Sequence, residues 1–288
     1  MTEPGLILFQ ADDGQDIFAQ VTGHGPPLVL LHEWASSHRV WEPIAHRLAD
    51  RFTVYRWDAR GHGSHGSHVV PASVRGSVSV TRMADDLACL LDHFGLEQPA
   101  VVGHSMGALT LWAYIARHGC GRLGKLCFID QSPRLTTDAT WPLGIYGDWP
   151  ATRDQAFITA MQADFVEAVI RLIAFGLNGA ARERYKSRHP SLQRLAAYLG
   201  MLDARPLIEV WPTLSGADFR PVLPAISVPT LLVYGEESNY YPPATGPYVR
   251  DAIAGAQLVI YANADHSPHV NQPDRFAADL AAFAGASG

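Results

Sequence analysis

The sequence predicts an α/β protein in which a mostly parallel sheet is covered by helices on both faces. Two observations support this prediction. Short apolar runs alternate along the chain with segments in which apolar residues recur at helical spacing. Several of these runs, such as residues 28–31 (Leu-Val-Leu-Leu), lack polar alternation, which is typical of a strand buried on both faces. Strand–helix–strand units of this kind favour a parallel sheet.

The individual elements follow from local signals along the chain. Residues 5–10 and 16–21 resemble an opening hairpin with its turn at Asp13-Gly14. A helix is expected over 81–95, because apolar residues recur there at helical spacing up to Gly95, a favoured helix stop. The remaining expected strands are 28–31, 52–57, 99–102, 125–130, 229–234 and 258–261, and the remaining expected helices are 39–50, 105–118 and 273–283.

One segment interrupts this alternation. Residues 133–225 contain helical stretches and many aromatic residues but no convincing strand, which indicates an inserted helical cap. We therefore predict a core domain built from residues 1–132 and 226–288, with the cap at 133–225. Most of the cap aromatics are expected to form the core of the insert. A few, with Trp141, Tyr146 and Trp149 as candidates, are expected to bind substrate.

Composition excludes several classes of function. The chain has 288 residues, 48% hydrophobic and 17% charged, with a net charge of −6, which argues against nucleic acid as a partner. No apolar run approaches the ~20 residues of a membrane span, and no signal peptide is visible. The three cysteines lack metal-like spacing and suggest reduced thiols in a cytoplasmic protein. The expected partner is a small-molecule substrate, and a homodimer is left open.

The most informative motif is Gly103-His104-Ser105-Met106-Gly107. It follows a predicted strand and opens a predicted helix, which is the context in which G-x-S-x-G presents a nucleophilic serine. The turn is so tight that side chains at both glycines would collide with neighbouring backbone. The pattern therefore predicts Ser105 as a nucleophile, with His104 beside the substrate, rather than a serine that only caps a helix.

A serine hydroxyl needs a base, normally a histidine that is oriented by a carboxylate. Among thirteen histidines, His266 lies directly after the last predicted strand and before the C-terminal helix. Side chains converge at such strand ends in open α/β sheets. His266 is therefore the predicted base, and His269 is its competitor.

These residues identify a family resemblance over essentially the whole chain. The sequence resembles the α/β-hydrolase fold superfamily, and within it the serine esterase and non-haem chloroperoxidase (perhydrolase) branch. Leu30-Leu31-His32-Glu33-Trp34 occupies the place of the family's strand followed by His-Gly-x. The resemblance implies that backbone N–H groups of Trp34 and Met106 form the oxyanion hole. Trp57–Gly63 resembles the family's D-x-R-G-x-G turn, in which Asp58 and Arg60 are expected to form a buried polar network.

Two positions depart from the family pattern. Glu33 replaces the usual glycine, so either a positive φ there costs about 1 kcal/mol or the loop has another shape. Ser238 stands where the family usually places its acid. We favour Asp130, at the end of the strand before the cap, over Glu236 and Glu237, because a strand end fixes a short carboxylate better than a loop fixes a long one.

The predicted protein is a serine hydrolase that cleaves a small, fairly apolar carboxylic ester, lactone or thioester through an acyl-enzyme on Ser105. No metal-ligand spacing or phosphate-binding loop is visible, so no cofactor and no metal are expected. The alternatives are a carbon–carbon bond hydrolase or lyase on the same scaffold, and a ligand-binding receptor with weak turnover.

Overall fold

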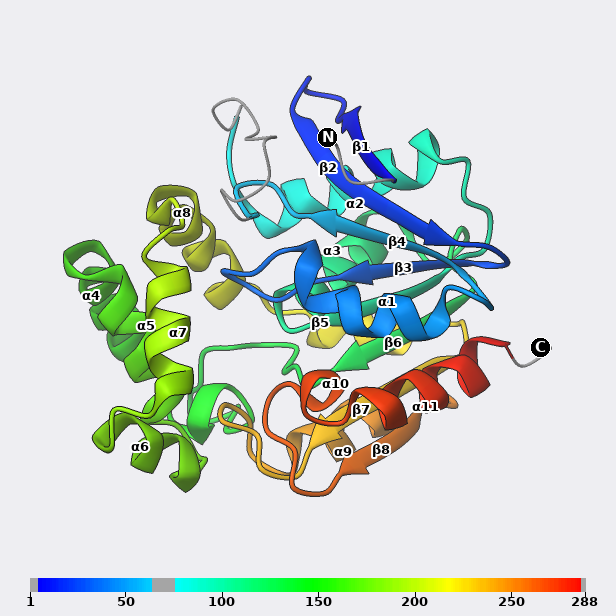
Figure 1. Cartoon of the computed structure of the whole chain (residues 1–288). Helices are drawn as coiled ribbons and strands as arrows, with labels where there is room; N and C mark the ends of the chain where they lie inside the picture. Colours follow the sequence, from blue (N-terminus) through cyan, green and yellow to red (C-terminus); the bar gives the residue numbers. More distant parts are fainter. Residues whose placement is uncertain (1–4, 64–75, 286–288) are drawn as a thin grey trace.

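The computed structural model of the chain describes residues 5–63 and 76–285. Its strands form one eight-stranded sheet in the order β1-β2-β4-β3-β5-β6-β7-β8 (Figure 1). The strands are β1 (Leu6–Gln10), β2 (Asp16–Gly23), β3 (Pro27–Leu31), β4 (Thr53–Asp58), β5 (Ala100–His104), β6 (Lys125–Ile129), β7 (Thr230–Gly235) and β8 (Gln257–Tyr261). Strands β1 and β2 pair antiparallel, β2 pairs antiparallel with β4, and all further pairs are parallel. The predicted mostly parallel sheet and its opening hairpin are confirmed.

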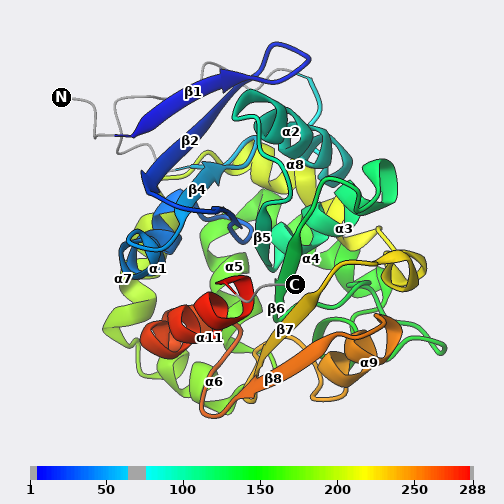
Figure 2. The same cartoon turned by 90° about the vertical axis from the view of Figure 1, so that its right-hand side faces the viewer.

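Helices cover both faces of this sheet. Figure 2 shows α1 and α11 on one face and α2, α3 and α9 on the other. The helices are α1 (Glu42–Leu48), α2 (Val80–His93), α3 (Met106–His118), α4 (Ala151–Ala163), α5 (Phe165–Ala174), α6 (Gly179–Lys186), α7 (Pro190–Leu199), α8 (Ala204–Ser215), α9 (Thr245–Ala252), α10 (Pro268–Asn271) and α11 (Pro273–Gly285), with 3-10 turns at His38–Trp41, Ile145–Gly147 and Arg220–Ala225. Helix α9 has no counterpart in the sequence prediction, because Gly246 and Pro247 in its first turn weaken its helical signal. Through the two described ranges, no helix has the length and apolar character needed to cross a membrane.

The parallel strands divide their side chains between two cores. In β3, Val29 and Leu31 belong to the core under α2 and α3, whereas Leu28 and Leu30 belong to the core under α1 and α11. Because successive side chains of a strand point to opposite faces, a strand between two helix layers must be apolar at every position. This explains why the parallel strands appear in the sequence as continuous apolar runs.

Helices α4 to α8 all lie between β6 and β7 in the chain. They form a group at the left of Figure 1, on the side toward which the arrowheads of β3 and β6 point. The described residues of this segment contribute no strand to the sheet, since β7 pairs directly with β6. The arrangement places this helical group over the strand ends that lead to Ser105 and Asp130. The division into separate core and cap domains stays a prediction.

The turn after β4 carries two polar clusters rather than one. Arg60 is buried and pairs with Asp86 at 2.6 Å and with Asp13 at 2.8 Å. Asp58 instead accepts from His38, with 2.8 Å between Nδ1 and Oδ1. These contacts give the buried charges hydrogen-bonded partners and connect the turn to neighbouring elements. The following stretch, residues 61–80, is rich in Gly, Ser and His, which predicts a surface loop, and it falls largely outside the described residues.

Candidate active site

The turn between β5 and α3 holds Ser105 in a conformation that residues other than glycine rarely adopt. Its φ is 53° and its ψ is −116°, so backbone strain is stored at the residue that carries the hydroxyl. A Cβ on Gly103 would lie 2.6 Å from the carbonyl oxygen of Gly107, and one on Gly107 would lie 2.3 Å from that of Leu31. The turn therefore requires both glycines, and it has the strand–turn–helix geometry of a nucleophile elbow.

The loop after β8 brings His266 to the carboxylate that follows β6. Nδ1 of His266 lies 3.2 Å from Oδ2 of Asp130, which is fully buried. Glu236 and Glu237, the two alternative acids, are exposed. Within the described ranges neither of them pairs with His266, and Glu236 accepts from the backbone N–H of Asn263 at 3.2 Å. The structure therefore pairs the predicted base with Asp130.

Burial changes the pKa of both members of this pair. It raises the pKa of Asp130 well above its ordinary value, and the nearby Ser238 hydroxyl opposes that rise only in part. Burial also lowers the pKa of His266 well below 6.5, with repulsion from His104 acting in the same direction. The neutral imidazole of His266 is therefore favoured near pH 7, and this is the form that accepts a proton.

Ser238 has a structural role at the end of β7, the position where the family usually places its acid. Its hydroxyl oxygen accepts from the backbone N–H groups of Tyr240 at 3.3 Å and Tyr241 at 3.2 Å, so it caps the turn after this strand. Its hydroxyl is close enough to lower the pKa of Asp130, although Oδ1 of Asp130 has no partner within ordinary hydrogen-bond geometry. Asp130 itself has a φ of 40°, a strained conformation of the kind that clusters at functional sites.

The two candidate oxyanion donors lie beside Ser105. Trp34 and Met106 line the same cavity as the serine, and neither backbone N–H donates a hydrogen bond to a described residue. The positive φ of the loop after β3 falls on Ala35, at 57°, and not on Glu33. The loop after β3 therefore differs in shape from the family pattern, and Glu33 does not adopt the strained left-handed conformation.

A cavity with about 520 Å³ of empty space, including the part open to solvent, joins these groups. Ser105, Trp34, Met106, Glu33 and His266 all line it. Sequence reasoning did not single out most of the remaining wall, which is largely apolar and aromatic. These additional residues are Leu109, Gln131, Leu135, Ile145, Leu172, Trp211, Leu214, Tyr240 and Tyr241. They come from both the sheet side and the helical segment, so only the folded chain identifies them.

The aromatic residues expected to bind substrate lie elsewhere. Trp141 donates its Nε1–H to the carbonyl of Arg134 at 3.0 Å, and Trp149 donates to Asp154 at 3.0 Å. The Tyr146 hydroxyl donates to the carbonyl of Leu172. None of the three rings lines the cavity, and each residue is instead hydrogen-bonded to another residue of the segment 133–225. Their assignment to substrate binding stays a prediction that this geometry does not support.

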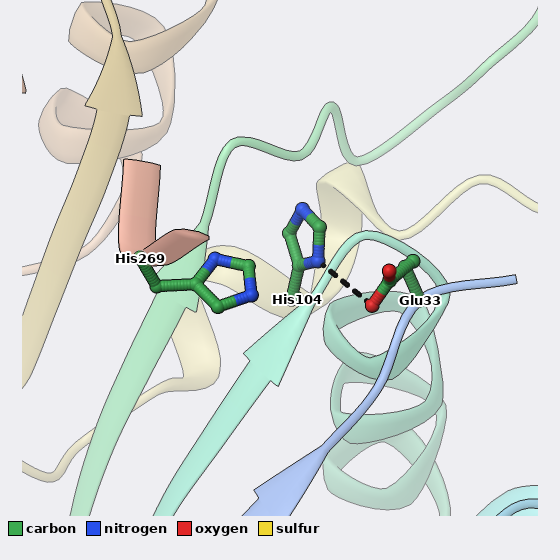
Figure 3. A group of neighbouring side chains, drawn as sticks. All are labelled: Glu33, His104 and His269. Carbon is green, nitrogen blue, oxygen red and sulfur yellow. Dashed lines mark hydrogen bonds and ion pairs between the residues drawn. The ribbon is translucent and has the colours of Figure 1, made fainter. Parts of the chain in front are cut away.

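His104 lies beneath the cavity rather than in its wall. Its side chain is fully buried, and its Nδ1 lies 3.2 Å from Oε2 of Glu33. Figure 3 shows His104 between Glu33 and His269, the three side chains coming from different segments of the chain. In the described ranges, this is the group of histidine and carboxylate side chains close enough to share a metal ion, and its ligand atoms all lie within 4.8 Å of one another.

Comparison with known proteins finds similarity along most of the chain. A family model described as the alpha/beta hydrolase fold matches residues 26–273. A pimeloyl-acyl-carrier protein methyl ester esterase from Stenotrophomonas maltophilia is 30% identical over 268 residues, which cover 92% of this chain and 95% of that protein. A non-heme haloperoxidase from Rhodococcus erythropolis is 28% identical over 276 residues, covering 95% and 97%. The solved esterase from Exiguobacterium antarcticum has the same fold, with a TM-score of 0.82 at 22% identity over 97% of this chain and 99% of that one.

Proposed function

This chain belongs to the alpha/beta hydrolase fold family and is a hydrolase, and from that premise we propose that it cleaves a small, fairly apolar carboxylic ester, lactone or thioester through an acyl-enzyme on Ser105. One observation carries the proposal. A serine in a strained turn and an imidazole paired with a buried carboxylate line one cavity. Those are the parts that nucleophilic acyl transfer requires.

The first half of the reaction acylates the serine. The Ser105 oxygen attacks the substrate carbonyl carbon, and Nε2 of His266 takes the hydroxyl proton. Because Nδ1 of His266 faces Asp130, we assign the proton of the resting imidazole to Nδ1, which leaves the lone pair on Nε2 for this step. When the tetrahedral intermediate collapses, the alcohol or thiol leaves with the proton that His266 returns to it.

The second half releases the acyl group. Water attacks the carbonyl carbon of the acyl-enzyme while His266 takes one of its protons. The intermediate then breaks to the carboxylic acid, and Ser105 recovers its proton from His266. In both halves the carboxylate of Asp130 holds the imidazole in one orientation and stabilises its positively charged form.

Backbone N–H groups stabilise the negative oxygen of each intermediate. Trp34 and Met106 are the proposed donors, since both line the cavity beside Ser105 and neither N–H has a partner in the described chain. Met106 is the first residue of α3, where the helix dipole also favours negative charge. Each such donor lowers the barrier by on the order of 3 kcal/mol.

The cavity wall supports a neutral, fairly apolar substrate. Leu, Ile, Trp and Tyr side chains form most of its surface. Among the described residues of the wall, the acidic side chain is Glu33. Burial raises its pKa, but the neighbouring imidazoles of His104 and His269 together lower it by more, so Glu33 stays ionised. A negative charge in the wall repels a free carboxylate on the substrate. Methyl and other simple esters are the first substrates to test, as the name of the Stenotrophomonas maltophilia relative suggests.

The decisive experiment compares the wild type with Ser105→Ala on p-nitrophenyl acetate. We expect kcat to fall about 10⁵–10⁶-fold, with an unchanged far-UV circular dichroism spectrum. Turnover within tenfold of the wild type would exclude Ser105 as the nucleophile. A parallel panel of esters, lactones and β-diketones separates ester hydrolysis from carbon–carbon cleavage, and the absence of any turnover on the panel would favour a receptor.

Three broader expectations remain proposals. The division into a core of 1–132 and 226–288 with a cap at 133–225 is supported by the all-helical segment between β6 and β7. A cytoplasmic location is supported by the free state of Cys89, Cys120 and Cys127. A homodimer can be tested by analytical ultracentrifugation.

A further inference from the structure

A second cluster of polar side chains lies beside the proposed triad and takes no part in acyl transfer. Glu33, His104 and His269 come from the loop after β3, the end of β5 and α10, and their ligand atoms lie within 4.8 Å of one another (Figure 3). His104 and His269 are 0% and 1% exposed, whereas the side chain of Glu33 is 24% exposed and reaches the cavity. The cluster is therefore buried but has a route to solvent.

The hydrogen bonds of His104 leave two acceptor atoms facing each other in this cluster. Nε2 of His104 lies 2.9 Å from the carbonyl oxygen of His266, which can only accept, so Nε2 carries a proton. In the neutral ring, Nδ1 then presents a lone pair. That lone pair faces Oε2 of Glu33 at 3.2 Å, and a carboxylate oxygen is also an acceptor. Two acceptors at this distance need a proton or a metal cation between them.

His269 provides independent evidence for a bound ligand. Both of its ring nitrogens are buried, and neither has a hydrogen-bond partner in the described structure. Its ring packs against Trp41 at 4.5 Å and against His104 at 4.5 Å between ring centroids. Burying an imidazole with no hydrogen-bond partner at either nitrogen costs free energy unless another group binds the ring. Packing against other rings does not supply such a group.

We propose that Glu33, His104 and His269 form a binding site for a divalent transition metal, with Zn²⁺ as the fitting ion. Two imidazoles and one carboxylate are a ligand set that zinc takes in proteins, and they exclude Mg²⁺ and Ca²⁺, which prefer oxygen ligands. Two atoms bound to one tetrahedral zinc at 2.0–2.1 Å lie about 3.3 Å apart, close to the separation of Glu33 and His104. His269 must then close in by on the order of 1 Å.

The place of this site gives it a consequence for the hydrolase. Each ligand is a near neighbour of a proposed catalytic group in the chain: Glu33 precedes Trp34, His104 precedes Ser105, and His269 follows His266 by three residues. A bound ion therefore links the oxyanion loop, the nucleophile elbow and the histidine loop. The proposed acyl transfer has no step through the metal, so the two proposals can fail separately.

The test is isothermal titration of chelator-treated protein with ZnCl₂. We expect one site per wild-type chain that is absent, or at least about 100-fold weaker, in His269→Phe, which keeps an aromatic ring but removes both nitrogens. Glu33→Gln, which keeps the shape and loses the charge, should weaken the same site at least about tenfold. The matched control is His118→Gln, which removes an exposed imidazole 3.0 Å from Asp85 and should leave the buried site unchanged within twofold.

Diffraction from zinc-soaked crystals at the zinc absorption edge locates the ion. The proposal predicts an anomalous peak bonded to Glu33, His104 and His269. It is overturned if wild type and His269→Phe bind zinc equally, or if the peak lies only at surface groups such as His118. A wild-type chain that binds no zinc also overturns it, and Glu33 then pairs with a protonated His104. Loss of esterase activity in Ser105→Ala leaves every one of these outcomes unchanged.

Discussion

His266 and His269 are separated by two residues, and both are buried, yet their surroundings differ. Nδ1 of His266 lies 3.2 Å from Asp130, and its ring lines the cavity that Ser105 shares. His269 has no hydrogen-bond partner in the described chain, and its ring lies against Trp41. Desolvation lowers the pKa of both imidazoles well below 6.5.

The difference between these two histidines shows that a shifted pKa does not identify a catalytic base. Both rings are held neutral by burial, so both could accept a proton in principle. Only His266 combines that state with an orienting carboxylate and access to the nucleophile. Partner and access therefore assign the roles, with His266 as the proposed base and His269 as a proposed metal ligand.

The same substitution at both positions gives the largest expected effect. His266→Phe should reduce kcat for p-nitrophenyl acetate about 10⁵–10⁶-fold, because no other imidazole in the described cavity wall can take the serine proton. His269→Phe in chelator-treated protein should stay within about tenfold of the wild type, since it leaves the proposed triad in place. Similar losses in both variants would break the comparison.

The next effect concerns the carboxylate that distinguishes the two histidines. Asp130→Asn should lower kcat about 10³–10⁴-fold, because the amide no longer stabilises the imidazolium of His266. Glu237→Gln is the control and should change kcat less than about threefold, since Glu237 is exposed and does not pair with His266. If Glu237→Gln had the larger effect, the acid would have to be reassigned.

Two tryptophans of the helical segment differ in a similar way, since one lines the cavity and the other packs away from it. Trp211 lines the cavity, whereas Trp141 does not. Trp211→Ala should change the ratio of kcat/KM for butyrate and acetate p-nitrophenyl esters about tenfold, because it enlarges the part of the cavity that binds the acyl group. Trp141→Ala should leave that ratio within about twofold of the wild type. Equal changes in the two variants would mean that selectivity follows general loosening of the helices.

The smallest effect is a displacement of the pH profile. Because burial lowers the pKa of His266, the imidazole stays unprotonated until the pH falls below 6.5, and kcat/KM should keep its plateau down to that pH. The midpoint of the acid limb should therefore lie below 6.5, measured with a neutral ester in the presence of a chelator. His269→Phe should leave this midpoint in place. A midpoint at or above 6.5 would contradict the assigned environment of His266.

The main features of the fold could be predicted from the sequence because its signals are local. Continuous apolar runs identified the parallel strands, and the strand–G-x-S-x-G–helix order identified the elbow at Ser105. The comparisons confirm the predicted family and its esterase and haloperoxidase branch. Element ends differ by one or two residues, as for β4 at Thr53–Asp58, because hydrogen-bond partners set strand ends.

The contacts that complete the site could not be predicted in the same way. Trp211 and Tyr240 reach the cavity from segments far from Ser105 in the chain, and no local pattern distinguishes them from Trp141. The ligand cluster of Glu33, His104 and His269 has no motif spacing, because a loop, a strand end and a short helix far apart in the chain supply it. Which polar side chains meet at the strand ends depends on how the helices pack, and only the folded chain determines that.

Covalent labelling tests the central claim most directly. We would incubate the wild type, His266→Phe and His269→Phe with a fluorophosphonate and locate the adduct by peptide mass spectrometry. The account predicts a single adduct on Ser105 that forms at similar rates in the wild type and His269→Phe, and at least about 1,000-fold more slowly in His266→Phe. An adduct on another residue, or equal labelling rates in all three proteins, would contradict it.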